Sequence, residues 1–357
     1  MSNPLEQVAR QRGEWLRGAG PLHEIVISTR IRLARNVAGF HFLTRADADA
    51  RKEIAETLQA ALKKARGLQN LVHLDIEELD ELDRGLMVER QLISRQHAEG
   101  TGSRRVAFLP DESASIMINE EDHLRLQVIR CGLQLDECWE QINEIDDAID
   151  EKIEYAFHAQ YGYLTACPTN VGTGIRVSVM LHLPALRLTN EIEKVIHAAK
   201  ELKLAVRGLY GEGTEALGDF FQISNQITLG RSEDQIIEDF RTHVIPKIVE
   251  YEQAGRRALL KGRLNALDDK IHRAMGTLQT ARLMSSNEAM QLLSHVRMGL
   301  HTGRVHSVDL PTLNDLLLQT QQAHLQKLQG ERLNGEQRSI VRATLIRARL
   351  ANGSQNN

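Results

Sequence analysis

Residues 24–33 read EIVISTRIRL and predict a β-strand, because successive side chains of a strand point to opposite faces of its sheet. One face of this strand carries Ser28, Arg30 and Arg32. The other face carries Ile27, Thr29, Ile31 and Leu33. A strand with one apolar and one polar face is typical of an antiparallel sheet that packs against helices on one side.

Two further segments repeat this arrangement and add arginines to the polar face. The segment NEEDHLRLQV at 119–128 places on one face Glu121, His123, Arg125 and Gln127. The segment IRVSVMLHL at 175–183 places on one face Arg176, Ser178, Met180 and His182. The segment VRGLYGEG at 206–213 adds Arg207 and leads into a glycine-flanked loop with Glu212. If these strands share a sheet, its polar face gathers Arg30, Arg32, Arg125, Arg176 and Arg207.

Guanidinium groups gathered on one face repel one another unless dense negative charge lies among them. A nucleotide triphosphate supplies such charge, and arginine grips phosphate oxygens with its planar fork. The alternative is that each arginine pairs with a carboxylate at the surface. Glu121 and Glu212 could hold a cationic acceptor beside the phosphates and take its proton, although a solvated glutamate is commoner. Neither a G-x-x-x-x-G-K-[ST] loop nor the H-R-D and D-F-G motifs occur, so a phosphate site here depends on arginine.

Composition narrows the class of protein. The chain has 357 residues, of which 42% are hydrophobic and 26% charged, as in globular proteins of two or three packed units. Its net charge of −4 gives no reason to expect nucleic-acid binding. The three cysteines, Cys131, Cys138 and Cys167, have spacings that predict neither a disulfide framework nor a zinc site. Without an apolar signal or membrane segment, we expect a soluble cytoplasmic protein with no membrane partner.

The order of the predicted elements indicates two domains. Helical periodicity recurs at 46–65, 134–157 and 190–203. It alternates with strand patterns, which predicts an α+β domain whose antiparallel sheet is flanked by helices. After residue 231 few strand patterns occur, and SEDQ at 232–235 marks a helix start. We expect an N-terminal segment 1–23, an α+β domain 24–255, a small all-helical C-terminal domain 256–350 and a disordered polar tail 351–357.

Four segments together resemble the catalytic domain of the phosphagen (guanidino) kinases, the ATP:guanido phosphotransferases. They are STRIRLAR at 28–35, NEEDHLR at 119–125, CPTNVGTGIRVSV at 167–179 and RGLYGEG at 207–213. Within that family the chain resembles the bacterial kinases that phosphorylate arginine in proteins. One reason is that the first segment lies close to the N-terminus, without the helical domain that precedes it in small-substrate members. We expect the open acceptor site that results to admit an arginine side chain of a protein.

The resemblance implies a role for each candidate residue. The phosphates of ATP would be bound by Ser28, Arg30, Arg32, Arg125, Arg176 and Arg207. The nucleotide site would be completed by Thr29, Ile31, Gln91, Val177, Ser178, Val179, Met180, Gly208, Leu209, Tyr210, Gly211 and Glu212. Glu121 and Glu212 would hold the acceptor guanidinium, Glu212 as the base, and Cys167 as a thiolate would steady it. A small buried thiol in a turn is the alternative for Cys167. Mg²⁺ would be held by the phosphates and water, with no protein ligand.

Two positions depart from the family pattern. Gln91 stands where several relatives carry a histidine that contacts the nucleotide, although its amide can still form hydrogen bonds. RSIVRA at 338–343 resembles an R-D-x-x-R-A motif that forms an allosteric phosphoarginine pocket in related enzymes. Here Ser339 replaces the aspartate, while Arg338 and Arg342, followed by Ala343, could still clamp a phosphate. The alternative for this stretch is an exposed basic helix.

The resemblance therefore predicts a protein arginine kinase that transfers the γ-phosphate of ATP to arginine side chains and marks proteins for regulation or degradation. It implies a stress-response repressor as substrate, a zinc-binding activator and a protease chaperone as partners, and a homodimer or higher oligomer. Two alternatives stay open, a small-molecule guanidino kinase and a non-catalytic adaptor that binds phosphoarginine.

Overall fold

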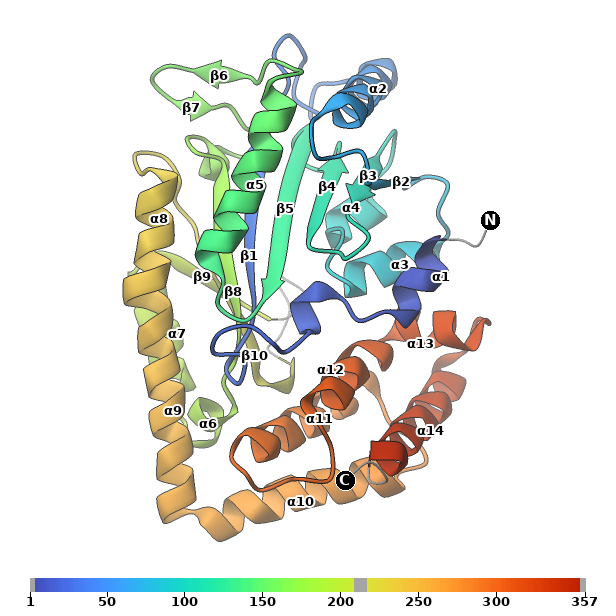
Figure 1. The fold of residues 1–357 in the computed structure, drawn as a ribbon, viewed down its shortest axis with the longest axis vertical. Coiled ribbons are helices and arrows are strands. Elements are labelled where there is room, and N and C mark those ends of the chain that lie inside the picture. Colours follow the sequence, from blue (N-terminus) through green and yellow to red (C-terminus); the bar gives the residue numbers. More distant parts are fainter. Residues whose placement is uncertain (1–3, 209–216, 354–357) are drawn as a thin grey trace.

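The computed structural model describes residues 4–208 and 217–353. Its centre is an eight-stranded antiparallel sheet with the strand order β2-β3-β4-β5-β1-β8-β10-β9 (Figure 1). The strands are β1 (Val26–Arg35), β2 (Val72–Asp75), β3 (Arg105–Phe108), β4 (Ala114–Ile118), β5 (Leu124–Cys131), β8 (Ile175–His182), β9 (Leu204–Arg207) and β10 (Phe220–Asn225). A separate pair of short strands consists of β6 (Phe157–His158) and β7 (Gly162–Tyr163). The predicted α+β fold with an antiparallel sheet is confirmed.

Helices form the main hydrophobic core with one face of this sheet. They are α2 (Ala48–Lys64), α5 (Leu135–Asp150), α7 (Ile192–Glu201), α8 (Glu233–Asp239) and α9 (Ile245–Gly262), with the π-helical turn η4 (Phe240–Val244) between the last two. The sheet contributes Ile31 and Leu33 of β1 and Val177 and Val179 of β8, all fully buried. The predicted apolar face of these strands is therefore the core face.

The opposite face carries the arginines. In the register of β1, Arg30 lies beside Ile129 of β5 and Ser178 of β8. Arg32 lies beside Gln127 of β5 and Arg176 of β8. Cross-strand partners share one face of a sheet, so arginines from different strands meet on this one.

The predicted position of Ile27 is wrong, because the register of β1 shifts between Val26 and Ser28. We expected Ile27 on the core face with Thr29. Instead it packs with Ile129 and Met180 in the hydrophobic core of the C-terminal helices. An irregularity of this kind offsets the alternation of side chains, which the sequence pattern does not reveal.

The segment 121–128 enters the sheet later than predicted. β5 begins at Leu124, because Asn119 adopts a left-handed conformation with φ of 60° and its N–H donates to the carbonyl of His123 at 2.9 Å. Glu121 therefore lies in the turn before the strand. Loop geometry rather than strand alternation sets the direction of its side chain.

The alternation of DFFQISNQITL at 219–229 predicts a strand that places Phe221, Ile223, Ile227 and Leu229 on one face. This strand ends earlier than the pattern predicts. β10 ends at Asn225, whose side-chain oxygen accepts a hydrogen bond from the N–H of Val177 at 2.8 Å. Ile227 and Leu229, which the pattern places on one face with the buried Phe221 and Ile223, are 41% and 51% exposed. The side chain of Asn225 thus ends the strand.

The C-terminal region is helical, as predicted, and has its own hydrophobic core. Its helices are α10 (Leu264–Thr280), α11 (Ser286–His301), α12 (Leu310–Gln319), α13 (Gln322–Gln329) and α14 (Gly335–Gly353). This core also contains Ile27 and Phe220, so the helices pack against one end of the sheet (Figure 1). The proposed domain boundary at 255 lies inside α9, and residues 351–353, expected in a disordered tail, continue α14.

Short elements complete the described chain. They are α1 (Pro4–Arg10), η1 (Glu14–Leu16), α3 (Glu81–Glu89), α4 (Arg95–Glu99), η2 (Pro168–Asn170), α6 (Pro184–Leu188) and η3 (Leu217–Asp219). Leu5 and Val8 pack in a third hydrophobic cluster with α3, and Trp15 packs in the C-terminal core. The N-terminal segment is thus packed into the molecule rather than set apart from it.

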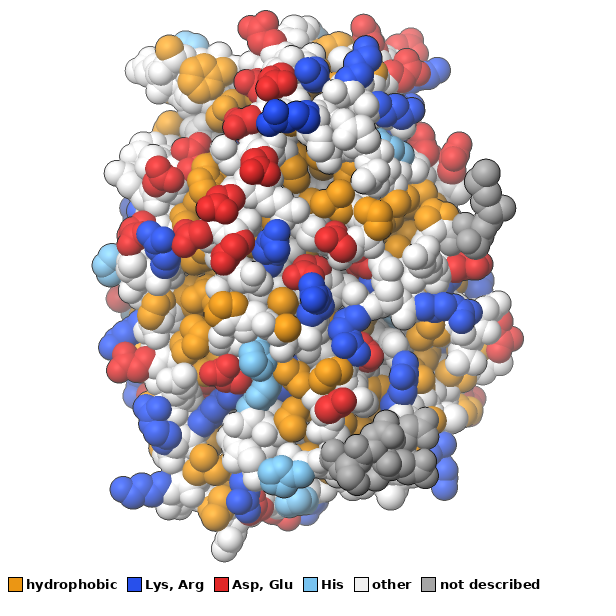
Figure 2. Space-filling model, viewed as in Figure 1, with side chains coloured by type: hydrophobic (Ala, Val, Ile, Leu, Met, Phe, Trp, Pro, Cys, Tyr) orange, Lys and Arg blue, Asp and Glu red, His pale blue; other side chains and the backbone are white. Residues whose placement is uncertain are grey.

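The surface of the molecule carries both signs of charge. Figure 2 shows acidic and basic side chains interspersed over one face. In the described part of the chain, none of the helices combines the length and apolar character that a membrane crossing requires.

Candidate active site

The arginine-bearing face of the sheet borders a cavity of about 640 Å³, which we call the arginine cavity. The predicted site residues that line it are Arg30, Arg32, Gln91, Glu121, Arg125, Cys167, Arg176 and Arg207. They come from β1, β5, β8 and β9 and from segments outside the strands. The fold thus brings together charged side chains that are distant in sequence.

Arg30 is held in this cavity by neutral hydrogen-bond acceptors. Its Nη1 donates to Oε1 of Gln91 at 2.9 Å and its Nη2 to Oε1 of Gln222 at 2.6 Å. Burial lowers the pKa of Arg30 to about 10, and the nearby charges of three further arginines act in the same direction. A buried positive charge with neutral partners favours the binding of an anion.

Arg32 provides a second indication of an anion. Its Nε is buried and has no hydrogen-bond partner. Burial first, and then the charges of Arg30, Arg125 and Arg176, lower its pKa. An unsatisfied buried donor costs about 1–3 kcal/mol, and more when it is charged. The oxygens of a phosphate would satisfy it, so the cavity fits the phosphates of a nucleotide.

Glu120, which our sequence analysis did not single out, forms an ion pair with Arg125. Its Oε1 accepts from Oγ of Ser94 at 2.5 Å, and its Oε2 accepts from the N–H of Glu121 at 2.8 Å. Burial would raise the pKa of Glu120, but the charge of Arg125 and these hydrogen bonds outweigh burial and lower it. Arg125, one of the predicted phosphate ligands, therefore has a carboxylate partner, and this partner lies inside the cavity rather than at the surface.

Of the two glutamates predicted to hold the acceptor guanidinium, Glu121 lies within the described residues. Burial raises its pKa, and the charge of Arg125 opposes that shift. The neighbouring Asp122 fixes the turn, since its Oδ1 accepts from Nδ2 of Asn36 and from the N–H of Ala166, both at 2.7 Å. These bonds tie the turn that carries Glu121 to the segment that leads to Cys167.

Cys167 precedes the short helix η2, and its side chain is half-buried. Its Sγ lies 3.0 Å from Oγ1 of Thr169, and either atom can donate. Among the described residues, no histidine or carboxylate forms a hydrogen bond with this sulfur.

The other predicted nucleotide contacts fall into three groups. The side chains of Thr29, Ile31, Val177 and Val179 are fully buried on the core face, so they do not line the cavity. Ser28, Ser178 and Met180 line a small adjoining cavity of about 10 Å³ together with Arg30 and Gln91. Gly208 is described and buried, whereas residues 209–212, including Leu209, Tyr210, Gly211 and Glu212, lie outside the described residues.

Three glutamines to which our sequence analysis gave no role also line the cavity. They are Gln127 of β5, Gln222 of β10 and Gln226 just after β10. Strand alternation placed Gln127 on the arginine-bearing face, and the alternation of residues 219–229 puts Gln222 and Gln226 on one polar face. A neutral amide carries no chemical signature of its own, so the pattern assigned none of them a role.

The C-terminal RSIVRA segment lies on α14, and the structure separates its two arginines. Arg338 lines a cavity of about 960 Å³ between α3, α4 and the C-terminal helices. Arg342 is buried, with Nε donating to the carbonyl of Thr320 at 2.7 Å and Nη1 to that of Met284 at 3.0 Å. Ser339 is half-buried, and its Oγ donates to the carbonyl of Gly335 at 3.1 Å. Ala343 is buried.

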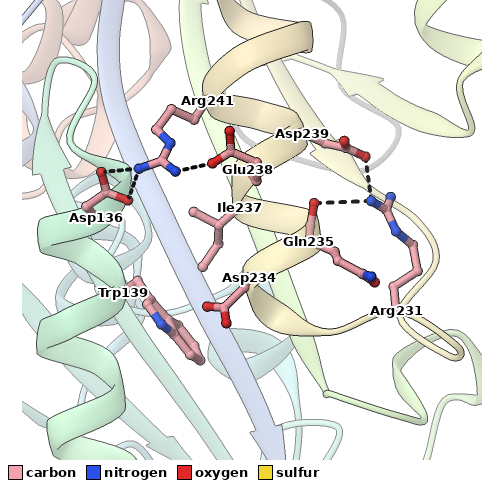
Figure 3. A pocket seen from close by; sticks show the side chains of 9 residues that line it. All are labelled: Asp136, Trp139, Arg231, Asp234, Gln235, Ile237, Glu238, Asp239 and Arg241. Carbon is pink, nitrogen blue, oxygen red and sulfur yellow. Dashed lines mark hydrogen bonds and ion pairs between the residues drawn. The ribbon is translucent and has the colours of Figure 1, made fainter.

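Another cavity, of about 690 Å³, lies between α5 and α8 (Figure 3). Its arginines are neutralised by neighbouring carboxylates. Arg241 bonds to Asp136 at 3.0 Å and to Glu238, and Arg231 bonds to Asp239 at 2.5 Å. In the arginine cavity, by contrast, Arg30 donates to the neutral side chains of Gln91 and Gln222, so that cavity is the better candidate for a phosphate site.

Two family models match the chain. Residues 53–255 match the ATP:guanido phosphotransferase C-terminal catalytic domain. Residues 264–357 match the protein-arginine kinase McsB C-terminal domain. Together they cover the sheet domain from α2 onward and the C-terminal helices.

Relatives and solved structures agree with these models. A protein-arginine kinase of Halothermothrix orenii is 44% identical over 343 residues, which is 96% of this chain and 98% of that protein. One of Symbiobacterium thermophilum is 45% identical over 97% of this chain and 99% of its own length.

Similar structures include a lombricine kinase, with a TM-score of 0.58, 26% identity and coverage of 68% of this chain and 72% of that one. Another is the duplicated taurocyamine kinase of Schistosoma mansoni, with a TM-score of 0.60, 27% identity and coverage of 66% and 34%. The chain therefore belongs to the protein-arginine kinases of the ATP:guanido phosphotransferase family.

Proposed function

We propose that this kinase transfers the γ-phosphate of ATP to the guanidinium groups of arginine side chains in proteins. The arginine cavity carries the proposal, because it combines buried positive charge with Glu121 and Cys167 at the same site. Phosphoryl transfer needs positioning and neutralisation of charge more than covalent chemistry. The relatives named protein-arginine kinases favour this substrate class over free guanidino compounds.

We propose that the arginines of the cavity and Ser28 bind the phosphates of ATP, and that Gln91 lies at the nucleotide site. Segments 176–180 and 207–212 would add backbone contacts. We propose that Mg²⁺ binds through the phosphates and water. Among the described residues no group of three or more histidine, cysteine, aspartate or glutamate side chains gathers as a ligand set.

The acceptor guanidinium is protonated at neutral pH and is therefore a poor nucleophile. We assign Glu121 and Glu212 to hold it from two sides, with Glu212 as the base. As the N–P bond forms, the bond from the γ-phosphorus to the bridging oxygen breaks, ADP leaves, and the proton passes to Glu212. A thiolate at Cys167 would hold the cation in the orientation for attack.

The product replaces a positive side chain by a negatively charged one, which suits a mark on a protein. A stress-response repressor as substrate, a zinc-binding activator, a protease chaperone that reads the mark, and a homodimer or higher oligomer belong to this proposal. So does a cytoplasmic location, which the three free cysteines support. A phosphoarginine pocket at 338–343 would depend on Arg338, because the guanidinium of Arg342 already donates to backbone carbonyls.

The test is mass spectrometry under non-acidic conditions of candidate proteins incubated with magnesium-ATP, the kinase and a candidate activator. Wild type should add phosphate to arginine, and Glu212→Ala should reduce the product at least about a hundredfold, as expected for loss of a general base. Glu151→Ala, at an exposed glutamate just after α5, is the matched control and should behave as wild type. Rapid turnover of free arginine without modified protein would refute the proposal.

A further inference from the structure

Three consecutive residues connect the arginine cavity to the C-terminal helices. Glu89 is the last residue of α3, Arg90 is its C-cap, and Gln91 follows. Glu89 and Arg90 contact α13, whereas Gln91 accepts the hydrogen bond from Arg30. This short segment therefore connects the nucleotide site with the other domain.

Glu89 caps α13 across the domain interface. Its Oε1 accepts from the N–H of Ala323 at 2.7 Å and its Oε2 from that of His324 at 2.8 Å. The N-cap residue of α13, Gln321, provides no side-chain hydrogen bond to the helix. Unsatisfied N–H groups at a helix start favour a carboxylate, so this contact holds α13 against the end of α3.

Arg90 extends the connection through a buried network. Its Nε and Nη2 bond to both oxygens of Glu112 at 2.8 and 2.5 Å, and both side chains are at most 1% exposed. Its Nη1 lies 3.2 Å from Nε2 of His324. Arginine can only donate, so Nε2 of His324 accepts and Nδ1 carries the proton, facing Glu89 at 3.7 Å. The side chain of Arg90 is thereby fixed from both domains.

Gln91 adopts a left-handed conformation, with φ of 64°. Glycine is the usual residue after a helix end in this conformation, and another residue there costs about 1 kcal/mol. The glutamine provides contacts that glycine lacks. Its Oε1 accepts from Arg30 at 2.9 Å, while its backbone carbonyl accepts from Nε2 of Gln127 at 2.6 Å.

We infer that Glu89, Arg90 and Gln91 form a positioning unit through which α13 sets the place of the Arg30 guanidinium in the nucleotide site. The inference rests on the proposed role of Arg30 in binding ATP. None of the three residues needs to touch the reacting atoms. A shift of α13 changes the end of α3, the left-handed turn at Gln91 and then the acceptor that holds Arg30.

The first test replaces Gln91. Gln91→Gly removes the side chain and relieves the left-handed backbone, so the thermal midpoint should not fall. The KM for ATP in the full-length enzyme should nevertheless rise about fivefold, with kcat changed less than about twofold. An unchanged KM would overturn the inference, because it would show that Arg30 needs no acceptor at this position.

The second test compares two contacts of the same interface. Glu89→Gln should raise the KM for ATP about threefold, a coupling of ordinary size between linked sites. The matched control is Asp83→Asn, which weakens the contact of Asp83 with Lys327 of α13 at 2.6 Å but does not lead to Gln91. This control should leave the KM unchanged. Equal increases in both variants would mean general loosening of the interface and would contradict a specific unit.

Two further measurements separate failure of this inference from failure of the proposed function. The double variant Glu89→Gln, Gln91→Gly should bind ATP as weakly as Gln91→Gly alone, because both act through one connection. Additive losses would count against the unit. Arg30→Ala should weaken ATP binding more than any of these variants. If Arg30→Ala binds ATP as well as these variants do, the proposed role of Arg30 fails. If only Arg30→Ala loses affinity for ATP, the positioning unit is refuted and the proposed role of Arg30 stands.

Discussion

At the scale of single residues, the arginine cavity holds charges that do not favour folding by themselves. Burial and the neighbouring arginines lower the pKa of both Arg30 and Arg32, so the folded state disfavours their positive charge. Strain of this kind is common at binding sites, where the ligand supplies the missing partner. At these two positions, the positive charge therefore favours nucleotide binding but lowers the stability of the enzyme without nucleotide.

Arg32→Met should make this opposition measurable. Removal of a buried charge whose Nε has no partner should raise the free energy of unfolding by about 1–3 kcal/mol in urea titrations without ATP. ATP binding should fall at least about tenfold, because a charge-assisted contact to phosphate is lost. Arg66→Met, at an exposed position after α2, should change neither quantity. A less stable Arg32→Met protein would show that its neighbours already satisfy Arg32.

The raised pKa of Glu121 predicts a pH dependence. Only the ionised carboxylate can hold a guanidinium, so activity should fall on acidification at a pH above the ordinary glutamate pKa of 4.5. Since folding raises this pKa, the ionised group destabilises the folded state, and protonation removes that cost as the pH falls. Glu121→Gln should therefore have a higher thermal midpoint at pH 7, and the difference should vanish below the unfolded pKa. Equal midpoints at both pH values would contradict the shift.

At the scale of elements, a buried ion pair joins β1 to α5 on the core side. Nη2 of Arg35 bonds to Oδ2 of Asp146 at 2.6 Å, and the guanidinium lies 3.6 Å from the ring centre of Tyr163 near the β6–β7 pair. Tyr155 borders the same guanidinium at 5.7 Å. This cluster fixes the helix against the strand that carries Arg30 and Arg32 on its other face.

Asp146→Ala should lower the free energy of unfolding by about 3–5 kcal/mol, because it leaves a buried guanidinium without its carboxylate. Chemical denaturation followed by circular dichroism measures the change. Asp147→Ala is the matched control, one residue along α5, where the carboxylate is exposed and accepts a hydrogen bond from Asn143. A loss of less than 1 kcal/mol in Asp146→Ala would mean that the two tyrosines suffice to hold Arg35.

At the scale of the whole molecule, the C-terminal helices complete the hydrophobic packing of the sheet. Ile27, Ile129, Met180 and Phe220 on one end of the sheet share their core with these helices. Nη2 of Arg297 donates to the carbonyl of His23 at 2.8 Å, and Nδ2 of Asn314 donates to that of Leu16 at 2.8 Å. The catalytic sheet therefore depends on residues far along the chain.

Truncation after residue 262 should expose this apolar surface. We expect the shortened chain to bind a hydrophobic dye, to associate in sedimentation experiments and to melt at least about 10 °C lower, given the buried area removed. Removal of residues 354–357 alone is the control and should have no effect. A monomeric truncated chain with an unchanged midpoint would show that the two cores are independent.

Much of the fold could be predicted from local pattern. The alternation of EIVISTRIRL identified the arginine-bearing face correctly at Arg30 and Arg32, because side chains of a strand alternate whatever their neighbours are. Strand alternation failed at Ile27, at Glu121 in the segment 119–128 and at Ile227 in the segment 219–229, where a register shift, a tight turn and an early strand end interrupt the period. The register shift and the strand end involve pairing with β8, which is distant in sequence, and the turn before β5 depends on the left-handed backbone of Asn119. Periodicity contains neither kind of information.

The amino-acid sequence by itself determined the antiparallel α+β sheet, the face on which the arginines lie, the helical C-terminal region and the kinase family. These features follow from the periodicity of side chains along strands and helices and from short sequence motifs, all of which are local in the sequence. Only the tertiary structure decided that Glu120 pairs with Arg125, that Gln91 and Gln222 hold Arg30, and that Arg342 is buried and donates to backbone carbonyls. Hydrogen bonds and burial depend on which distant segments meet, so they are properties of the folded chain.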